Sequence, residues 1–248
     1  MKIAGQLRGG CLHHVSLNSH LYNFDQVRQL SHRIQCLRLY LFSFNVTSLC
    51  WPNLTRLQLG HSRVSISDLT AANFPSLKHL AFHYIEPGQN DADWSPPALQ
   101  SLRFIANWDP AWIKRLHACQ RSLLSLDFRI TGKTKHLPST KLCLPKLRCL
   151  CLFDDHWVPY PIDLTTPALG TYFQHQVSYQ LQNSLLHKDL HSVTYVCIQH
   201  VPTLSVFPRL RTLHLSIGPS NAHFEIIQRT LREMYSSELQ AAQESMDR

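Results

Sequence analysis

Glycine and charged residues are both scarce in this sequence of 248 residues. It contains 8 glycines, and aspartate, glutamate, lysine and arginine together make up only 16% of it. So few glycines leave little material for a loop that binds phosphate through backbone amides, and neither G-x-G-x-x-G nor a Walker-type loop occurs. The G-x-S-x-G and H-E-x-x-H motifs of common hydrolases are missing too. We therefore expect no enzymatic activity and no cofactor.

Long hydrophobic runs are also missing. A membrane-spanning helix needs about 18 or more apolar residues in succession, and the best candidate, residues 36–44, is shorter and contains Arg38. The first ten residues, MKIAGQLRGG, lack the apolar core of a secretion signal. Because 44% of the residues are hydrophobic, the chain should nevertheless fold. We expect a cytoplasmic or nuclear protein with no membrane partner.

The eight cysteines follow no recognisable disulfide or zinc pattern. Without a secretion signal, we expect free thiols, and no C-x-x-C pair is present. Residues 13–14 and 154–156 each supply only a fragment of a ligand set, so we expect no metal site. Cys149 and Cys151 flank Leu150 on a predicted outward strand face, and we expect these two thiols to be open to oxidation.

What the sequence does contain is a recurring leucine pattern. Five segments fit apolar-Pro-x-Leu-x-x-Leu-x-Leu/Phe, namely WPNLTRLQL from Trp51, FPSLKHLAF from Phe74, PPALQSLRF from Pro96, LPKLRCLCL from Leu144 and FPRLRTLHL from Phe207. Weaker copies of Leu-x-x-Leu-x-Leu begin at Leu12, Ile34, Leu123, Leu169 and Val193. The ten copies start 17 to 24 residues apart. Leucine-rich repeats have periods of about 20 to 29 residues.

This pattern predicts short parallel strands. The last two leucines of each copy are two residues apart, so they share one face of a strand. One strand cannot bury that face alone, but stacked copies form a parallel sheet with a continuous core. Proline is tolerated where a strand begins, because no hydrogen-bond donor of the ladder is lost there. Six prolines lie two residues before a first leucine: Pro52, Pro75, Pro97, Pro145, Pro167 and Pro208.

We therefore predict an α/β fold, a leucine-rich-repeat solenoid over residues 12–217 with irregular or helical segments between the strands of a curved parallel sheet. Asp109-Pro110 predicts the start of one such helix, with Trp112, Leu116 and Cys119 on one face. Residues 218–248 are predicted to form a capping helix and tail. A mixed α/β domain that shares the leucine pattern by coincidence remains the alternative.

Residues 1–11 are predicted to be an N-terminal extension that leaves the first repeat uncapped. The exposed edge of that strand has three possible explanations. The extension folds over the edge, a partner covers it, or the chain is a shortened gene product. We favour the third explanation.

The signature resembles the leucine-rich-repeat region of fungal F-box proteins, over about residues 12–217. Such proteins carry an N-terminal F-box that docks on a Skp-type adaptor in a cullin ubiquitin ligase, and their repeats present the substrate. The resemblance implies a protein-binding scaffold that acts as the substrate-recognition part of such a ligase. No F-box is found in residues 1–11, so we expect a Skp-type adaptor as partner only if an F-box exists upstream.

The outward positions of the predicted strands form the candidate protein-binding surface on the concave face. They lie before the second leucine, between the second and third, and after the third. The candidate residues are Arg38, Tyr40, Arg56, His79, His83, Arg103, Asp127, Arg129, Phe173, His175 and His214. Four arginines beside one aspartate indicate a partner protein with an acidic segment, whose carboxylates arginine contacts in bidentate fashion.

A second interpretation is that the same basic concave face binds nucleic acid or another polyanion. The formal net charge of +8 supports it. Only Tyr40 and Phe173 among the candidates are aromatic groups that stack on bases, and no RNA-binding signature occurs. We therefore favour a protein partner over nucleic acid.

Overall fold

The computed structural model describes residues 5–8, 11–17, 28–40, 46–60, 66–83, 94–107, 111–131, 140–154, 162–176, 192–198 and 207–215. These residues form an α/β fold with one open, mostly parallel sheet and few helices. The sheet has eleven strands in the order β1-β2-β3-β4-β5-β6-β7-β9-β11-β12-β13. Their bounds are β1 Gly5–Arg8, β2 Cys11–Leu17, β3 Cys36–Tyr40, β4 Arg56–Gly60, β5 His79–His83, β6 Ser101–Asn107, β7 Ser125–Thr131, β9 Cys149–Asp154, β11 Thr171–Gln176, β12 Tyr195–Ile198 and β13 Thr212–Leu215.

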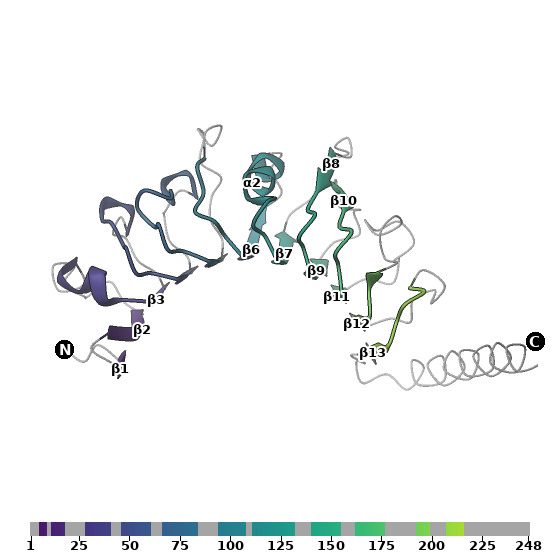
Figure 1. The fold of residues 1–248 in the computed structure, drawn as a ribbon, viewed down its shortest axis with the longest axis horizontal. Coiled ribbons are helices and arrows are strands. Elements are labelled where there is room, and N and C mark those ends of the chain that lie inside the picture. Colours follow the sequence, from purple (N-terminus) through teal and green to yellow (C-terminus); the bar gives the residue numbers. More distant parts are fainter. Residues whose placement is uncertain are drawn as a thin grey trace, which may run out of the picture.

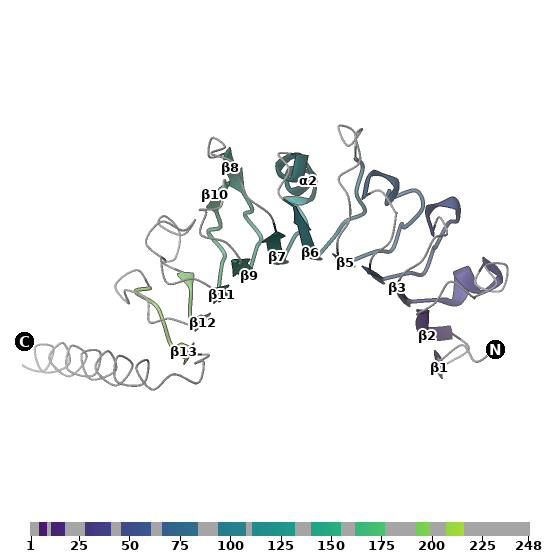
Figure 2. The same cartoon turned by 180° about the vertical axis from the view of Figure 1, so that it is seen from behind.

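The remaining described elements lie on the other side of the core. They are helix α2 (Ala111–Cys119), the 3-10 helices η1 (Ser31–Arg33), η2 (Val46–Ser48) and η3 (Ile66–Asp68), and the parallel pair β8 (Thr140–Cys143) and β10 (Ile162–Thr165). Figure 1 shows an arc whose inner side is formed by the large sheet, with α2, β8 and β10 on the outer side. Figure 2 shows the same arrangement from behind. The sheet lines the inside of the arc, so the face of the sheet that is turned away from the core is concave.

The buried leucines of neighbouring strands lie opposite one another. Leu57 pairs with Leu80, Leu80 with Leu102, Leu102 with Leu126, and Leu126 with Leu150. Each of these side chains is at most 1% exposed. Burying a leucine side chain stabilises a fold by about 1.5–3 kcal/mol. The prediction that alternate residues of these strands share one buried face is confirmed.

Five of these strands follow a four-residue turn with proline at its second position. The carbonyl of Trp51 accepts a hydrogen bond from the Leu54 amide at 3.3 Å, and the same bond closes the turns before Leu77, Leu147, Leu169 and Leu210 at 3.0–3.2 Å. Proline suits that position because its ring fixes φ at the value the turn requires. The apolar residue ahead of the proline is buried, as for Trp51 and Phe74. The apolar-Pro-x-Leu signature is therefore a turn that inserts one side chain into the core.

The start of each strand is held to the preceding one by a pair of backbone hydrogen bonds. The carbonyl of Thr55 accepts from the amides of Lys78 and His79 at 2.9 and 3.0 Å, and the carbonyl of Lys78 accepts from Gln100 and Ser101 at 2.8 and 3.0 Å. The same pair recurs at each step from Gln35 to Thr212. The residues that begin the strands therefore occupy fixed positions along one edge of the sheet.

The N-terminal extension differs from our expectation. β1 pairs antiparallel with β2, with Gly5 opposite Val15 and Arg8 opposite Cys11. The first parallel strand is therefore not left with an open backbone edge. Part of the extension therefore folds against the first parallel strand, as the first of the three explanations expects, and β1 becomes the edge of the sheet.

Helix α2 confirms the predicted helix with one apolar face, whereas its predicted start at Asp109-Pro110 lies outside the described residues. Trp112, Leu116 and Cys119 are all buried on one face. The Trp112 ring stacks on Phe104, with ring centroids 4.1 Å apart. The guanidinium of the buried Arg115 lies 4.5 Å from the centroid of the Trp112 ring, and burial lowers the pKa of Arg115 to about 10. This helix therefore contributes its apolar face to the core.

The predicted capping helix in residues 218–248 lies outside the described residues. Within the described part of the chain, no helix is both long and apolar enough to cross a membrane.

Replacing Leu57 tests the assignment of strand faces. Leu57→Ala should lower the free energy of unfolding by about 2–5 kcal/mol, because it leaves a cavity in the core. Leu57→Asp should unfold the protein, because a charge would be buried without a partner. Urea denaturation followed by circular dichroism measures both effects. The neighbouring Arg56→Ala is the control and should change stability little; equal effects of Leu57→Asp and Arg56→Ala would mean that the faces are assigned wrongly.

Candidate binding surface on the concave face

The structure places the candidate residues on the face of the sheet opposite the core. The candidate side chains that it describes are all partly or fully exposed, unlike the leucines beside them. They are Arg38 and Tyr40 on β3, Arg56 on β4, His79 and His83 on β5, Arg103 on β6, Asp127 and Arg129 on β7, Phe173 on β11 and His214 on β13. His175 belongs to β11, but its side chain lies outside the described part.

Arg38 is part of a hydrogen-bonded group on β3 and β4. Its Nε donates to Oε1 of Gln58 at 2.8 Å, and Nε2 of Gln58 donates to the Tyr40 hydroxyl at 3.0 Å. The Arg38 guanidinium lies 5.3 Å from the centroid of the Tyr40 ring. The group holds the Arg38 charge at a fixed place on the concave face. The sequence analysis missed Gln58, although it occupies the same position of the leucine pattern as Arg38.

Gly60 makes room for the Tyr40 ring. The two residues lie opposite each other in the β3–β4 register. A Cβ atom at Gly60 would come within 2.7 Å of Cε1 of Tyr40, closer than non-bonded carbon atoms approach. The ring therefore lies directly against the backbone of β4, and its hydroxyl reaches Gln58. At this position on the concave face glycine is required by space.

Arg103 and Asp127 form an ion pair, with 3.0 Å between Nε and Oδ2. They face each other across β6 and β7. The Arg103 side chain is 52% exposed, so the pair itself stabilises the fold by at most about 1 kcal/mol. The one aspartate of the candidate set thus offsets the charge of one of its four arginines.

Positive charge gathers around β3, β4 and β5. Arg56 is exposed on β4 beside Arg38 on β3. Partial burial, and then the charges of Arg56 and Lys78, lower the pKa of His79. His79 is therefore neutral at physiological pH and adds a hydrogen-bonding imidazole rather than a charge. On β3, β4 and β5 the described residues present arginine to a partner and include no carboxylate.

The other half of the concave face is neutral. At the outward positions of β9, β11, β12 and β13 the sequence has no lysine or arginine. Phe173 on β11 and Tyr195 on β12 place their ring centroids 5.5 Å apart at an interplanar angle of 51°. Cys149 and Cys151 lie on the same face, both partly buried. Tyr195 was missed in the sequence analysis, although it holds the same pattern position as Arg56.

Burial acts against the expectation that Cys149 and Cys151 are open to oxidation. Burial, followed by the charge of Asp127, raises the pKa of the Cys151 thiol to about 12. Burial also raises the pKa of Cys149. The thiolate is the reactive form, so both shifts favour the less reactive thiol, and oxidation of the two residues stays a prediction.

Within the described part of the chain, no three histidine, cysteine, aspartate or glutamate side chains are grouped so that they could hold a metal ion. No family model and no curated protein matches the sequence. The interpretation of this surface therefore depends on its own residues.

Adding a methyl group at Gly60 should break the contact with Tyr40. We expect Gly60→Ala to destabilise the protein by about 1–3 kcal/mol, because the ring must leave its place on β4. In the Tyr40→Ala background the same change should have a much smaller effect, since the clash is gone. Urea denaturation of the four proteins measures this coupling. An equal loss in both backgrounds would contradict the contact.

Cys151 should react slowly with iodoacetamide. At pH 8 we expect its alkylation to be at least about tenfold slower than that of the exposed Cys50 and Cys143, because almost none of its thiol is ionised. Peptide mass spectrometry over a time course measures the three rates, and a sample unfolded in urea should label all three alike. Alkylation of Cys151 as fast as that of Cys50 in the folded protein would show that its thiol is accessible and ionised.

Proposed function

We propose that this protein is a leucine-rich-repeat solenoid that acts as a non-enzymatic scaffold and binds an acidic segment of another protein on its concave face. The observation that carries the proposal is the in-register leucine column, because it directs every second side chain of the strands to the concave side. The outward residues then differ from strand to strand while the buried ones stay apolar. Such a surface is suited to binding.

Three features support the repeat architecture. The leucine pattern recurs every 17 to 24 residues. Equivalent positions of its copies face one another from β4 to β9. The same pair of backbone hydrogen bonds joins each copy to the next. A coincidental leucine pattern in an ordinary mixed domain would not be expected to produce this equivalence at each step.

The charges on β3 to β5 support an acidic partner. Arg56 is exposed, and Arg38 is held by Gln58, which leaves the rest of its guanidinium for an incoming carboxylate. A hydrogen bond to a charged group contributes about 1.5–3 kcal/mol, and a few such contacts dominate most interfaces. Arg38, held in place, and the exposed Arg56 together favour an acidic segment.

The resemblance to F-box proteins extends the proposal to a biological role. We propose that the scaffold presents substrate to an F-box type ubiquitin ligase in the cytoplasm or nucleus. A Skp-type adaptor would be a partner only if an F-box is present upstream. The residues of the concave face therefore support only the binding of a substrate segment.

Binding of a polyanion on the concave face is less well supported. Arg103 is paired with Asp127, and the half formed by β9 to β13 has no outward lysine or arginine. A long polyanion would meet charge on only part of this face. A short acidic segment beside an apolar or aromatic one fits both halves.

Peptide display against the full chain tests the proposed function. Peptides selected from a random library should be rich in aspartate and glutamate, and Arg56→Glu should weaken their binding by about tenfold or more, since it replaces attraction with repulsion. Lys141→Glu, with the same change of charge on the exposed outer strand β8, is the matched control and should leave binding unchanged. Fluorescence anisotropy with the synthesised peptides measures the affinities.

Two results would contradict the proposal. One is a set of selected peptides without an excess of acidic residues. The other is equal weakening by Arg56→Glu and Lys141→Glu, which would mean that only the total charge of the protein matters.

A further inference from the structure

The edge of the sheet at which the parallel strands begin carries a row of basic side chains. Three positions of the leucine pattern lie at this edge. They are the residue two before the first leucine of each copy, the residue directly before it and the residue directly after it. From the copy at Ile34 to the copy at Leu210 these positions hold seven lysines and arginines and no aspartate or glutamate. The seven residues, which we name the strand-start edge, are Arg33, Lys78, Arg121, Lys146, Arg148, Arg209 and Arg211.

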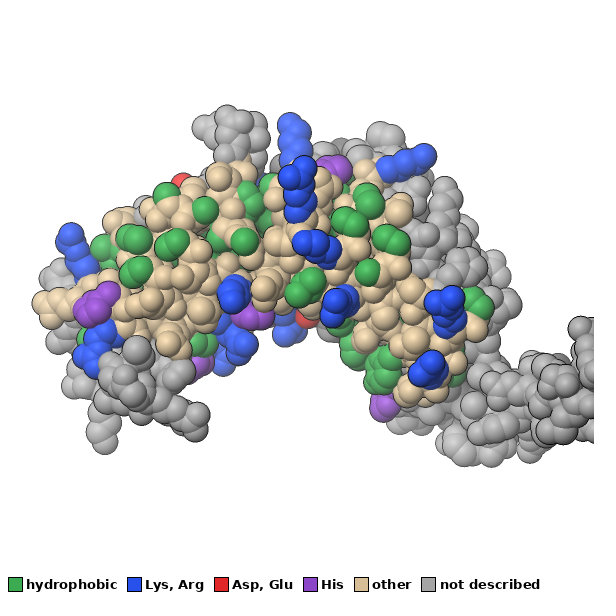
Figure 3. All heavy atoms as spheres, in the orientation of Figure 1, with side chains coloured by type: hydrophobic (Ala, Val, Ile, Leu, Met, Phe, Trp, Pro, Cys, Tyr) green, Lys and Arg blue, Asp and Glu red, His purple; other side chains and the backbone are tan. Residues whose placement is uncertain are grey.

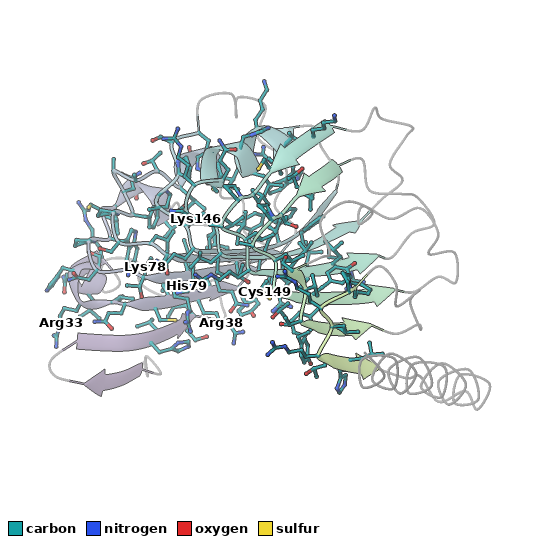
Figure 4. The ribbon with its side chains drawn as sticks, turned by 45° about the vertical axis from the view of Figure 1, so that its right-hand side comes forward. Arg33, Arg38, Lys78, His79, Lys146 and Cys149 are labelled. Carbon is teal, nitrogen blue, oxygen red and sulfur yellow. The ribbon has the colours of Figure 1, made fainter. Side chains whose placement is uncertain are left out.

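These side chains point into solvent. Arg33 is partly exposed and the other six are exposed. Figure 3 looks onto this edge and shows lysine and arginine side chains along it, with almost no acidic groups. Figure 4 shows Lys78 and Lys146 toward the starts of the strands, away from Arg38 on the concave side. The strand-start edge is therefore a surface separate from the concave face.

The excess of one charge is larger here than in the whole protein. The three positions hold seven lysines and arginines and no acidic residue, whereas the whole sequence holds 24 lysines and arginines and 16 aspartates and glutamates. Surfaces that only need to stay soluble mix both signs, whereas a row of one sign concentrates oppositely charged molecules along it.

The backbone fixes the spacing of these charges. Lys78, Arg148 and Arg211 each directly precede a strand, β5, β9 and β13, and their amides take part in the recurring pair of hydrogen bonds. Neighbouring strands lie about 4.8 Å apart, so three strand steps separate Lys78 from Arg148 by roughly 14 Å. The charges are thus spread along the arc in a narrow row.

The shape of the row indicates a linear partner. Each strand of DNA carries a phosphate about every 3.4 Å along the helix axis, so a duplex that lies along the row brings several phosphates within reach of its basic groups. The three positions hold no phenylalanine, tyrosine or tryptophan in these copies, and the stacking on such rings that single strands rely on is therefore missing. The exposed apolar residues at these positions are prolines and alanines, and Leu124 is only partly exposed, so the large apolar side chains that insert into a membrane surface are few.

We propose that the strand-start edge binds the phosphate backbone of double-stranded nucleic acid without reading its sequence. This activity goes beyond the proposed binding of an acidic protein segment and uses different residues. The densest part of the edge is formed by Arg121, Lys146 and Arg148, which precede the neighbouring strands β7 and β9. A duplex bound there leaves the concave face open.

Fluorescence anisotropy of a labelled 20-base-pair DNA duplex with the full chain tests the proposal. Affinity should fall steeply between about 50 and 200 mM salt, because phosphate contacts release counterions. Two duplexes of unrelated sequence should bind alike. The double variant Lys146→Glu/Arg148→Glu should weaken binding by at least about tenfold and lower the slope of log affinity against log salt by about two.

The matched control is Lys114→Glu/Lys141→Glu, which makes the same change of charge at exposed positions on α2 and β8. It should change duplex affinity by less than about threefold, since the outer side is not in contact. Thermal unfolding of each variant by circular dichroism confirms that the fold is retained. Equal weakening by the two double variants would overturn the proposal, because net charge alone would explain the binding.

A second experiment measures whether the protein sediments with vesicles that contain phosphatidylserine, which tests a membrane surface as the anionic partner. If the protein sediments with these vesicles and does not bind the duplex, the assignment to nucleic acid is wrong. Lys146→Glu/Arg148→Glu should leave the binding of acidic peptides intact, and Arg56→Glu should leave duplex binding intact. Failure of this proposal can therefore be told apart from failure of the proposed function.

Discussion

Burial of leucine against leucine between neighbouring parallel strands is the interaction on which the rest of this structure depends. The column from Leu57 through Leu80, Leu102 and Leu126 to Leu150 is at most 1% exposed, and each member faces the next in register. A slip of one residue in any strand would turn its whole apolar face to solvent. The column therefore fixes both the register of the sheet and the identity of the residues that face outward.

Two separate surfaces follow from that constraint. Alternation along the strands sends Arg56 and its neighbours to the concave face. The turn before each strand sends Lys146 to the strand-start edge, and the recurring backbone hydrogen bonds hold Arg148 beside it. The two surfaces differ in their charge. The concave face combines a basic end with an aromatic end around Phe173 and Tyr195. Its only described carboxylate, Asp127, forms an ion pair with Arg103. The edge has basic groups alone, so it is suited to a partner whose charge is spread along a line.

Much of the fold could be predicted from the sequence, because the leucine pattern is local. The buried faces and helix α2 follow from spacing within a few residues. The pairing of β1 with β2 could not be predicted. Residues 5–8 show no alternation of apolar and polar residues, and their backbone hydrogen bonds depend on the neighbouring strand. The ion pair between Arg103 and Asp127 requires the register of two strands 24 residues apart. The pKa of Cys151 depends on burial by side chains from several strands, which a pattern of one strand does not reveal. Lys78 and Lys146 are plain in the sequence, but they lie just before the strands, where the alternation of inward and outward strand residues does not place a side chain.

Hydrogen exchange at single amides, measured by NMR, tests the central claim most directly. The amides of His79, Ser101, Ser125 and Cys149 each donate to the carbonyl of the preceding copy at 3.0–3.1 Å. If the leucine column holds the strands as one stack, these four amides should exchange slowly and with a common free energy of opening, because one cooperative unit must open to expose them. Exchange at any of them as fast as in an unfolded chain, while the others stay protected, would contradict a continuous stack.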